Sequence, residues 1–318
     1  MLLLAAAAAI VAGLAFGSVS TPVVEVLSAL LHPQANAVSD IVWKLRLPRV
    51  LAAFSCGGLL ALAGTLMQVL LRNPLADPYV FGISGGAALG VLLGMLLGAG
   101  TVIQTGLGLG GAALISALVF GLSLGAGNWN PYRLLLIGVV VAAGANALLS
   151  LILVLAPQAA VKGMLYWLMG DLGYADHPLP ALVVMGLLFL VAVPFAPAMN
   201  VLMLGRLKAQ SLGVAVSRIE LLLFGIAAVA AVTAVLIGGT IGFVGLVVPH
   251  LVRLLGLADH RSLLPGAVLV GGGFLTLADT LARSAWAPLQ FPVGVLTALL
   301  GVPVLLLLLS GRDRNVAH

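Results

Sequence analysis

One serine lies in a setting that could support nucleophilic chemistry: Ser84, in the string GISG at residues 82–85. A serine becomes nucleophilic when a base lies beside it, and His250 in another apolar segment is the available candidate. The string matches the GxSG pattern of intramembrane serine proteases, but two of its four residues are glycine in a chain with 40 glycines. The sequence PHLVRLLG around His250 also lacks the small residues that would let its helix pack tightly beside the serine helix. We therefore predict no catalytic residue.

Residue types that bind metals or phosphates are sparse and poorly spaced. Cys56 is the single cysteine and lies in an apolar segment, which excludes an intrachain disulfide and a cysteine metal cluster. No GxxxxGK[ST] phosphate loop is present, so any ATP that drives this protein must be bound by a partner. The histidines have no mutual spacing of three or four residues and no paired carboxylates; they are His32, His177, His250, His260 and His318. We predict no metal site and no cofactor in this chain.

Asp279 is the one acidic residue well inside a predicted membrane segment, and Arg283 follows it by four residues. Ionisable groups within a membrane are candidates for function by default. Here the spacing places the two side chains on one helix face, where they can form an ion pair. A proton-coupled pump would need a chain of titratable groups, which the sequence lacks. We therefore expect a structural ion pair.

The elements that must position these residues are membrane helices. Of the 318 residues, 62% are hydrophobic and 7% are charged, far below the roughly 25% charged residues of soluble domains. Apolar runs of about 20 residues recur along the chain, long enough to cross a bilayer as helices and unlike the short alternating strands of a β-barrel. The sequence predicts an all-α membrane protein, a single transmembrane domain over residues 1–318. Breaks at proline, glycine pairs and charges predict a polytopic bundle of about ten helices, at residues 2–30, 47–71, 80–99, 102–125, 133–156, 178–198, 218–239, 242–257, 263–286 and 291–310.

Basic residues in the connecting segments predict the orientation. With cytoplasmic termini, nine Lys and Arg residues lie inside and five lie outside. The outside group works against the positive-inside rule and suggests an acidic partner there; it contains Lys44, Arg46, Arg49, Lys162 and Arg283. We predict a multi-pass protein whose N- and C-termini are both cytoplasmic.

Residues 72–90, RNPLADPYVFGISGGAALG, join a polar, proline-broken segment to a glycine-rich helix. Pro74 and Pro78 cannot continue a helix and bias the residues before them towards extended backbone, which predicts a kinked hinge. Further along, glycines recur every four residues, a spacing that lets another helix backbone approach closely; they are Gly86, Gly90, Gly94 and Gly98.

The longest polar interval predicted on the inside is GRLKAQSLGVAVSRIE, residues 205–220. Three basic residues and one glutamate give it a net charge of +2. Helix-favouring residues lie on either side of Gly213. The pattern predicts a helix, a glycine turn and a second helix lying against the membrane surface, although an ordinary amphipathic connector would give the same pattern.

Several of these segments together resemble a known family. They resemble, in order, the permeases of the iron-chelate, haem and cobalamin ABC importers, the FecCD type. The matching strings are LRLPRVLAA, RNPLADPYVFGISGGA, SLGV, GFVGLVVPHLVRLLG, DHRSLLPGA, LADTLAR and FPVGVLTALLGVPVLLLLL. The resemblance covers about residues 44–310, most of the chain.

The resemblance implies a transport subunit and not an enzyme. It implies ten helices per subunit and a homodimer in the bacterial inner membrane, with the pathway along the two-fold axis. Two ATPase subunits that carry ATP and magnesium would lie below it and a periplasmic binding protein above it, with no nucleic acid partner. Such transporters often contain inverted repeats, so helices two to five and seven to ten are expected to correspond, although the internal sequence similarity does not show it.

The resemblance also assigns roles to residues. Asn73 and Leu75 match positions that close the cytoplasmic end of the pathway near the dimer axis. Residues 128–133 occupy the place of a second constriction but lack the small hydroxyl residues expected there. The implied docking residues for the binding protein are Arg46, Arg49 and Arg283. Residues 203–220 match the cytoplasmic segment that contacts the ATPase, and the implied coupling residues are Arg206, Ser211, Leu212, Gly213 and Val214.

We expect this permease to import a bulky metal chelate by alternating access. The breadth of the family favours a ferric siderophore or haem ahead of cobalamin, and no residue selects among them. An intramembrane serine protease and an ion-coupled secondary carrier are the remaining alternatives. Labelling of Ser84 by a serine-hydrolase probe would favour the first, and uptake driven by a proton gradient without an ATPase would favour the second.

Overall fold

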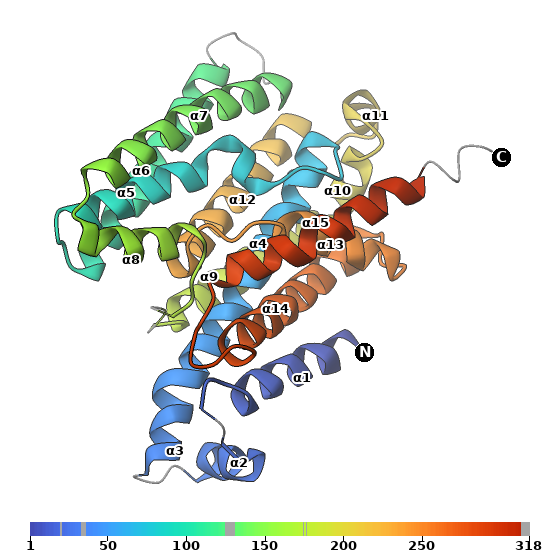
Figure 1. Cartoon of the computed structure of the whole chain (residues 1–318). Helices are drawn as coiled ribbons and strands as arrows, with labels where there is room; N and C mark the ends of the chain where they lie inside the picture. Colours follow the sequence, from blue (N-terminus) through green and yellow to red (C-terminus); the bar gives the residue numbers. More distant parts are fainter. Residues whose placement is uncertain (20, 33–35, 125–130, 174, 176, 313–318) are drawn as a thin grey trace.

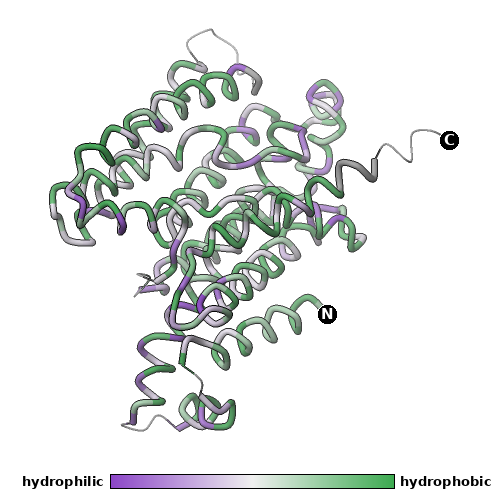
Figure 2. Tube along the Cα trace, in the orientation of Figure 1, coloured by the Kyte–Doolittle hydropathy of each residue, from purple (hydrophilic) through white to green (hydrophobic). Residues whose placement is uncertain are grey.

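The computed structural model describes residues 1–19, 21–32, 36–124, 131–173, 175 and 177–312, which form helices and their connections (Figure 1). Six of the described helices are long and apolar enough to cross a membrane, and four shorter apolar helices bring the number to ten. Hydrophobic residues follow the helices, while hydrophilic residues gather at helix ends and connections (Figure 2). The predicted polytopic bundle is thus confirmed.

The helices occur in a simple chain order. Those of the first half are α1 (Leu2–Ala15), α2 (Val23–Leu31), α3 (Ala37–Asp40), η1 (Ile41–Arg46), α4 (Leu47–Leu71), η2 (Pro78–Phe81), α5 (Ile83–Leu96), α6 (Thr101–Leu124) and α7 (Pro131–Leu155). Those of the second half are α8 (Gln158–Leu168), α9 (Leu179–Ala192), η3 (Val193–Phe195), α10 (Ala196–Leu202), α11 (Arg206–Ser211), α12 (Val216–Gly238), α13 (Val244–Leu254), α14 (His260–Ser284) and α15 (Val293–Arg312).

The boundaries of α4 agree with the prediction, but those of the first helix do not. The predicted helix over residues 2–30 ends at Ala15, and α2 begins at Val23 after Pro22. Pro22 has no amide hydrogen to donate and favours extended backbone in the residue before it, so it starts a new helix instead of continuing the old one. The sequence also did not predict α8, which begins directly after Pro157.

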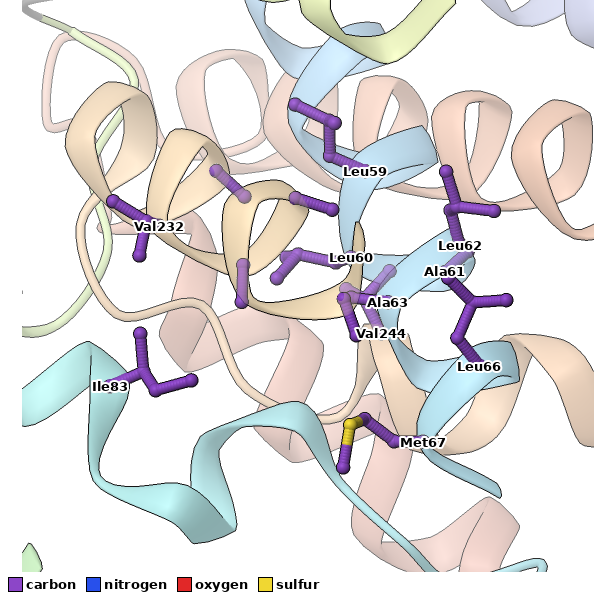
Figure 3. Packing of buried hydrophobic residues seen from close by; sticks show 14 of the residues in the cluster. Leu59, Leu60, Ala61, Leu62, Ala63, Leu66, Met67, Ile83, Val232 and Val244 are labelled. Carbon is purple, nitrogen blue, oxygen red and sulfur yellow. The ribbon is translucent and has the colours of Figure 1, made fainter. Parts of the chain in front are cut away.

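Helix α4 is the centre of the bundle. Every residue from Ser55 to Leu70 is buried, and the helix packs against α14, α12, α13 and α9. Figure 3 shows Leu60 and Ala63 of α4 beside Val244 of α13, and Val232 of α12 belongs to the same buried cluster. A Cβ atom on Gly64 would lie 1.8 Å from the carbonyl oxygen of Gly245, so the backbones of α4 and α13 approach more closely than any side chain would permit.

Helices α5, α6 and α7 form a second group beside α12 (Figure 1). The predicted glycine stripe accounts for part of this packing, because a Cβ atom on Gly86 would lie 2.5 Å from the Gly111 oxygen and one on Gly90 would lie 2.0 Å from the Leu107 oxygen. Gly98 lies beyond the end of α5 with a φ of 65° and faces open space. Gly86 and Gly90 therefore permit close packing of α5 against α6, whereas Gly98 lies in the turn that follows α5.

Candidate functional site

The predicted gate begins where α4 ends. Arg72 takes the left-handed conformation with a φ of 48°, and the Asn73 amide donates to the Gln68 carbonyl at 3.1 Å. The side-chain oxygen of Asn73 accepts a hydrogen bond from the Leu75 amide at 2.9 Å, which closes a tight turn. Asn73 therefore fixes the backbone that carries Leu75, and the two residues form one structural unit.

Both gate residues line a cavity of about 400 Å³ together with Leu135 of α7. Leu75 is 39% exposed, so an apolar side chain faces this space. The structure thus brings Asn73 and Leu75 together beside an open volume, and α4 ends at Leu71, before Pro74. Their role as a gate stays a prediction.

The gate turn is anchored at both of its ends. On the α4 side, Arg253 of α13 donates to the Gln68 side-chain oxygen at 2.7 Å, and Gln68 donates to the Leu246 carbonyl at 3.3 Å. On the other side, Asp77 caps η2 by accepting from the Tyr79 amide at 2.8 Å. Burial raises the pKa of the Asp77 carboxyl, and the hydrogen bond from Tyr79 opposes that shift.

The coupling segment, residues 203–220, has the glycine turn that the sequence predicts. Helix α11 ends at Ser211, Gly213 has a φ of 81°, and the Val214 amide donates to the Ala209 carbonyl at 3.0 Å. No atom lies within 4 Å of a Cβ atom on Gly213, so the backbone conformation and not the available space requires glycine there.

The second half of this segment differs from the prediction. Instead of a second surface helix, the first turn of the long helix α12 begins at Val216. Arg206 connects the two halves, because its guanidinium donates to the Ser217 hydroxyl at 3.0 Å and lies 3.5 Å from the Glu220 carboxylate. Leu207 and Leu212 are 83% and 63% exposed and give the segment an apolar outer surface.

The three predicted docking arginines lie at the opposite end of α4, where they meet a buried carboxylate. Asp279 is 1% exposed and accepts from Arg49 at 2.9–3.1 Å through two guanidinium nitrogens. Arg283 lies 3.5 Å from the same carboxylate, which confirms the predicted pair with Asp279. Arg49 also donates to Gln290 at 3.0 Å and lies 3.8 Å from Asp171. This cluster joins α4 and α14 to two connecting segments.

The docking role implied that Arg46 and Arg283 face the solvent, but both side chains are buried. Arg46 is 3% exposed and donates to the carbonyls of Leu14, Ala15 and Val19. Arg283 is 5% exposed and donates to the carbonyl of Gly13. The last carbonyls of a helix have no partner within it and attract positive charge, so both arginines cap the end of α1. Their docking role stays a prediction.

Several residues that form polar contacts between helices and connecting segments had no role in the sequence-based interpretation: Gln68, Asp171, Asn200, Glu220, Arg253, Asp259 and Gln290. Most of their partners are far away in the sequence, so no local spacing points to them. The string DHRSLLPGA is part of the family resemblance, which assigns no role to Asp259. Residues 128–130 of the predicted second constriction lie outside the part of the chain that the structure describes.

The chain is thus a helical bundle with a proline-broken turn beside a cavity at one end and a buried ionic cluster at the other. The model of the FecCD transport family matches residues 3–311, so the chain belongs to this family. It is a membrane permease subunit of the ABC importer class, and not an enzyme. The resemblance seen in the sequence is confirmed.

Individual relatives agree with this assignment. The vitamin B12 import system permease protein BtuC of Escherichia coli O157:H7 is 39% identical over 278 residues, which cover 85% of this chain and 84% of BtuC. A solved inward-facing metal-chelate type ABC transporter is 30% identical with a TM-score of 0.87, over 98% of this chain and 97% of that one. PsaBC from Streptococcus pneumoniae, at 16% identity and a TM-score of 0.58 over 85% of this chain and 93% of its own, shares the fold alone.

Proposed function

We propose that this permease imports a corrinoid of the cobalamin type across a bacterial inner membrane. The observation that carries the proposal is the 39% identity to vitamin B12 permeases over 85% of the chain. This similarity favours cobalamin over the ferric siderophore or haem that we expected from the sequence. The metal-chelate transporter, at 30% identity, supports a different chelate as the second candidate.

The proposed assembly contains two copies of the chain, two ATPase subunits and a periplasmic binding protein. The ATPases bind residues 203–220 on the cytoplasmic side, where both termini also lie. Closure of the ATPases around ATP moves these segments and opens or shuts the constriction at Asn73 and Leu75. The exposed leucines of the coupling segment and the cavity beside Leu75 support these assignments.

Docking of the binding protein is proposed for the opposite end of the bundle. Arg49 is the most exposed of the three arginines there, with 14% of its side chain accessible. Arg46 and Arg283 can bind acidic residues of a partner only by exchanging backbone carbonyls of α1 for the partner's carboxylates. Such ion pairs affect orientation and association rate more than affinity.

Uptake by the reconstituted complex tests the proposal. Proteoliposomes that contain the permease with its ATPase and binding protein are expected to accumulate labelled cyanocobalamin only when ATP is supplied to the ATPase side. Labelled ferric siderophore and haem are measured in parallel, and vesicles without the ATPase are the control. Faster uptake of either iron chelate would transfer the assignment to that chelate. Uptake without the ATPase would contradict ATP-driven import.

A further inference from the structure

Helix α10 leads directly into the coupling segment and carries Asn200. Both the nitrogen and the oxygen of the Asn200 side-chain amide form hydrogen bonds. The Asn200 nitrogen donates to the Asp259 carboxylate at 2.8 Å. The Asn200 oxygen accepts from the His260 amide at 3.0 Å and lies 2.6 Å from the His260 ring nitrogen Nδ1. A single side chain therefore holds the first residues of α14 through three polar contacts.

The end of α14 that Asn200 holds is well defined. Asp259 is the residue before α14 and accepts from the Arg261 amide at 2.8 Å, so it caps the helix. The hydrogen bonds from the Arg261 amide and from Asn200 hold the pKa of Asp259 below its ordinary value. The carboxylate thus remains an acceptor for Asn200 at neutral pH.

The residues between Asn200 and α11 form consecutive hydrogen-bonded turns. The Leu204 amide donates to the Val201 carbonyl at 3.0 Å, and the Gly205 amide donates to the Leu202 carbonyl at 3.1 Å. The Ala209 amide then donates to the Gly205 carbonyl at 2.9 Å, which joins the turn to α11. A displacement of α11 therefore reaches α10 through short backbone contacts.

Helix α14 then extends to the opposite end of the molecule. It runs from His260 to Ser284, and a helix of 25 residues is roughly 37 Å long. Near its far end Asp279 binds Arg49 of α4, the helix that ends at the gate turn. One helix thus connects the coupling segment with the buried ionic cluster and with α4.

We propose that Asn200 is a positioning residue that transmits movement of the coupling segment to α14 during transport. The inference rests on the proposed coupling role of residues 203–220. Coupling between distant sites requires an element whose position both sites influence. Helix α14 is such an element, because it contacts Asn200 at its start and Arg49 near its end. Loss of the Asn200 contacts is then expected to separate ATP hydrolysis from transport.

The test compares variants of the complete complex of permease, ATPase and binding protein in proteoliposomes. Asn200→Ala removes all three contacts. Asp259→Ser keeps a good helix cap but shortens the side chain, so that it no longer reaches Asn200. Ser262→Ala is the matched control, because the Ser262 hydroxyl donates to the Asp259 carbonyl within the same turn. The measured quantity is cyanocobalamin imported per ATP hydrolysed.

Asn200→Ala and Asp259→Ser are expected to lower this ratio at least about fivefold with hydrolysis and thermal stability retained, while Ser262→Ala behaves as the wild type. The double variant should match Asn200→Ala, because that substitution already removes the contact with Asp259. An unchanged ratio for Asn200→Ala, or multiplied losses in the double variant, would overturn the proposal. Should Asn200→Ala fail to assemble, the ratio of Asp259→Ser decides.

Gly213→Val separates this inference from the proposal on which it rests. A β-branched residue is strained at the φ of 81°, so this variant distorts the coupling turn itself. A normal ratio in Gly213→Val would reject the coupling role of residues 203–220. A low ratio in Gly213→Val with a normal ratio in Asn200→Ala would reject only the role of Asn200.

Discussion

At the residue scale, the ionic cluster shows how burial changes the role of a charged side chain. Arg49 and Arg283 share one carboxylate, Asp279, which is 1% exposed. Removing one partner from a buried pair is costly because the remaining charge has lost its water as well as its partner. These arginines are therefore structural residues here, whatever further part they take in docking.

Asp279→Asn is expected to destabilise the protein by about 3–5 kcal/mol, because it leaves the buried Arg283 guanidinium without its counter-charge and leaves Arg49 with the more distant Asp171 at 3.8 Å. Thermal unfolding in detergent measures the effect. Asp40→Asn is the matched control, since Asp40 pairs with Lys44 at 2.7 Å while 63% of its side chain is exposed. Equal unfolding temperatures for the two variants would contradict the structural role of Asp279.

At the scale of elements, glycine positions decide how closely helices approach. The spacing of four residues indicated a close contact, and the structure assigns α6 as the partner of α5. The glycines face backbone oxygens of that helix at Gly86 and Gly90. The same residue type acts differently at Gly213, where a turn requires a positive φ.

Gly90→Ala is expected to destabilise the protein by about 1–3 kcal/mol, because the added methyl group would lie 2.0 Å from the Leu107 oxygen and must separate α5 from α6. Gly106→Ala in α6 is the control, since no atom lies within 4 Å of its Cβ position. Thermal unfolding of both variants in the same detergent provides the measurement. A stable Gly90→Ala variant would show that the two helices separate at little cost.

At the scale of the whole molecule, α7 exposes an apolar face. Val140 and Leu136 are 71% and 68% exposed, and the neighbouring Leu135 lines the cavity at the gate turn. The family resemblance places that gate near a dimer axis. The exposed face of α7 near Leu136 is therefore the surface that we expect a second copy to cover.

A cysteine at Leu136 is expected to form a disulfide between two copies under mild oxidation in membranes, detected as a dimer band on a non-reducing gel. The native Cys56 is buried and does not interfere. Leu187→Cys on α9 is the control, because Leu187 is also exposed, at 57%, but does not line the cavity at the gate turn. Equal dimer bands for both cysteines, or a band for neither, would contradict this interface.

Local chemistry made much of this protein predictable. The length and hydrophobicity of each apolar run specify a membrane helix, and a spacing of four residues pairs Asp279 with Arg283 on one face. The turn at Gly213 was predictable because glycine readily adopts a positive φ. The break after Ala15 was missed because the apolar run continues past Pro22, and hydrophobicity alone does not report a change of direction.

The sequence by itself determined the class of fold, the positions of most helices and the transporter family, because these depend on composition, periodicity and motif order. Only the tertiary structure decided the partners of the charged and polar side chains. Arg49 meets Asp279 across 230 residues, Arg46 meets the end of α1, and Asn200 meets Asp259 across 59 residues. Such contacts depend on how helices pack, and no local pattern records that arrangement.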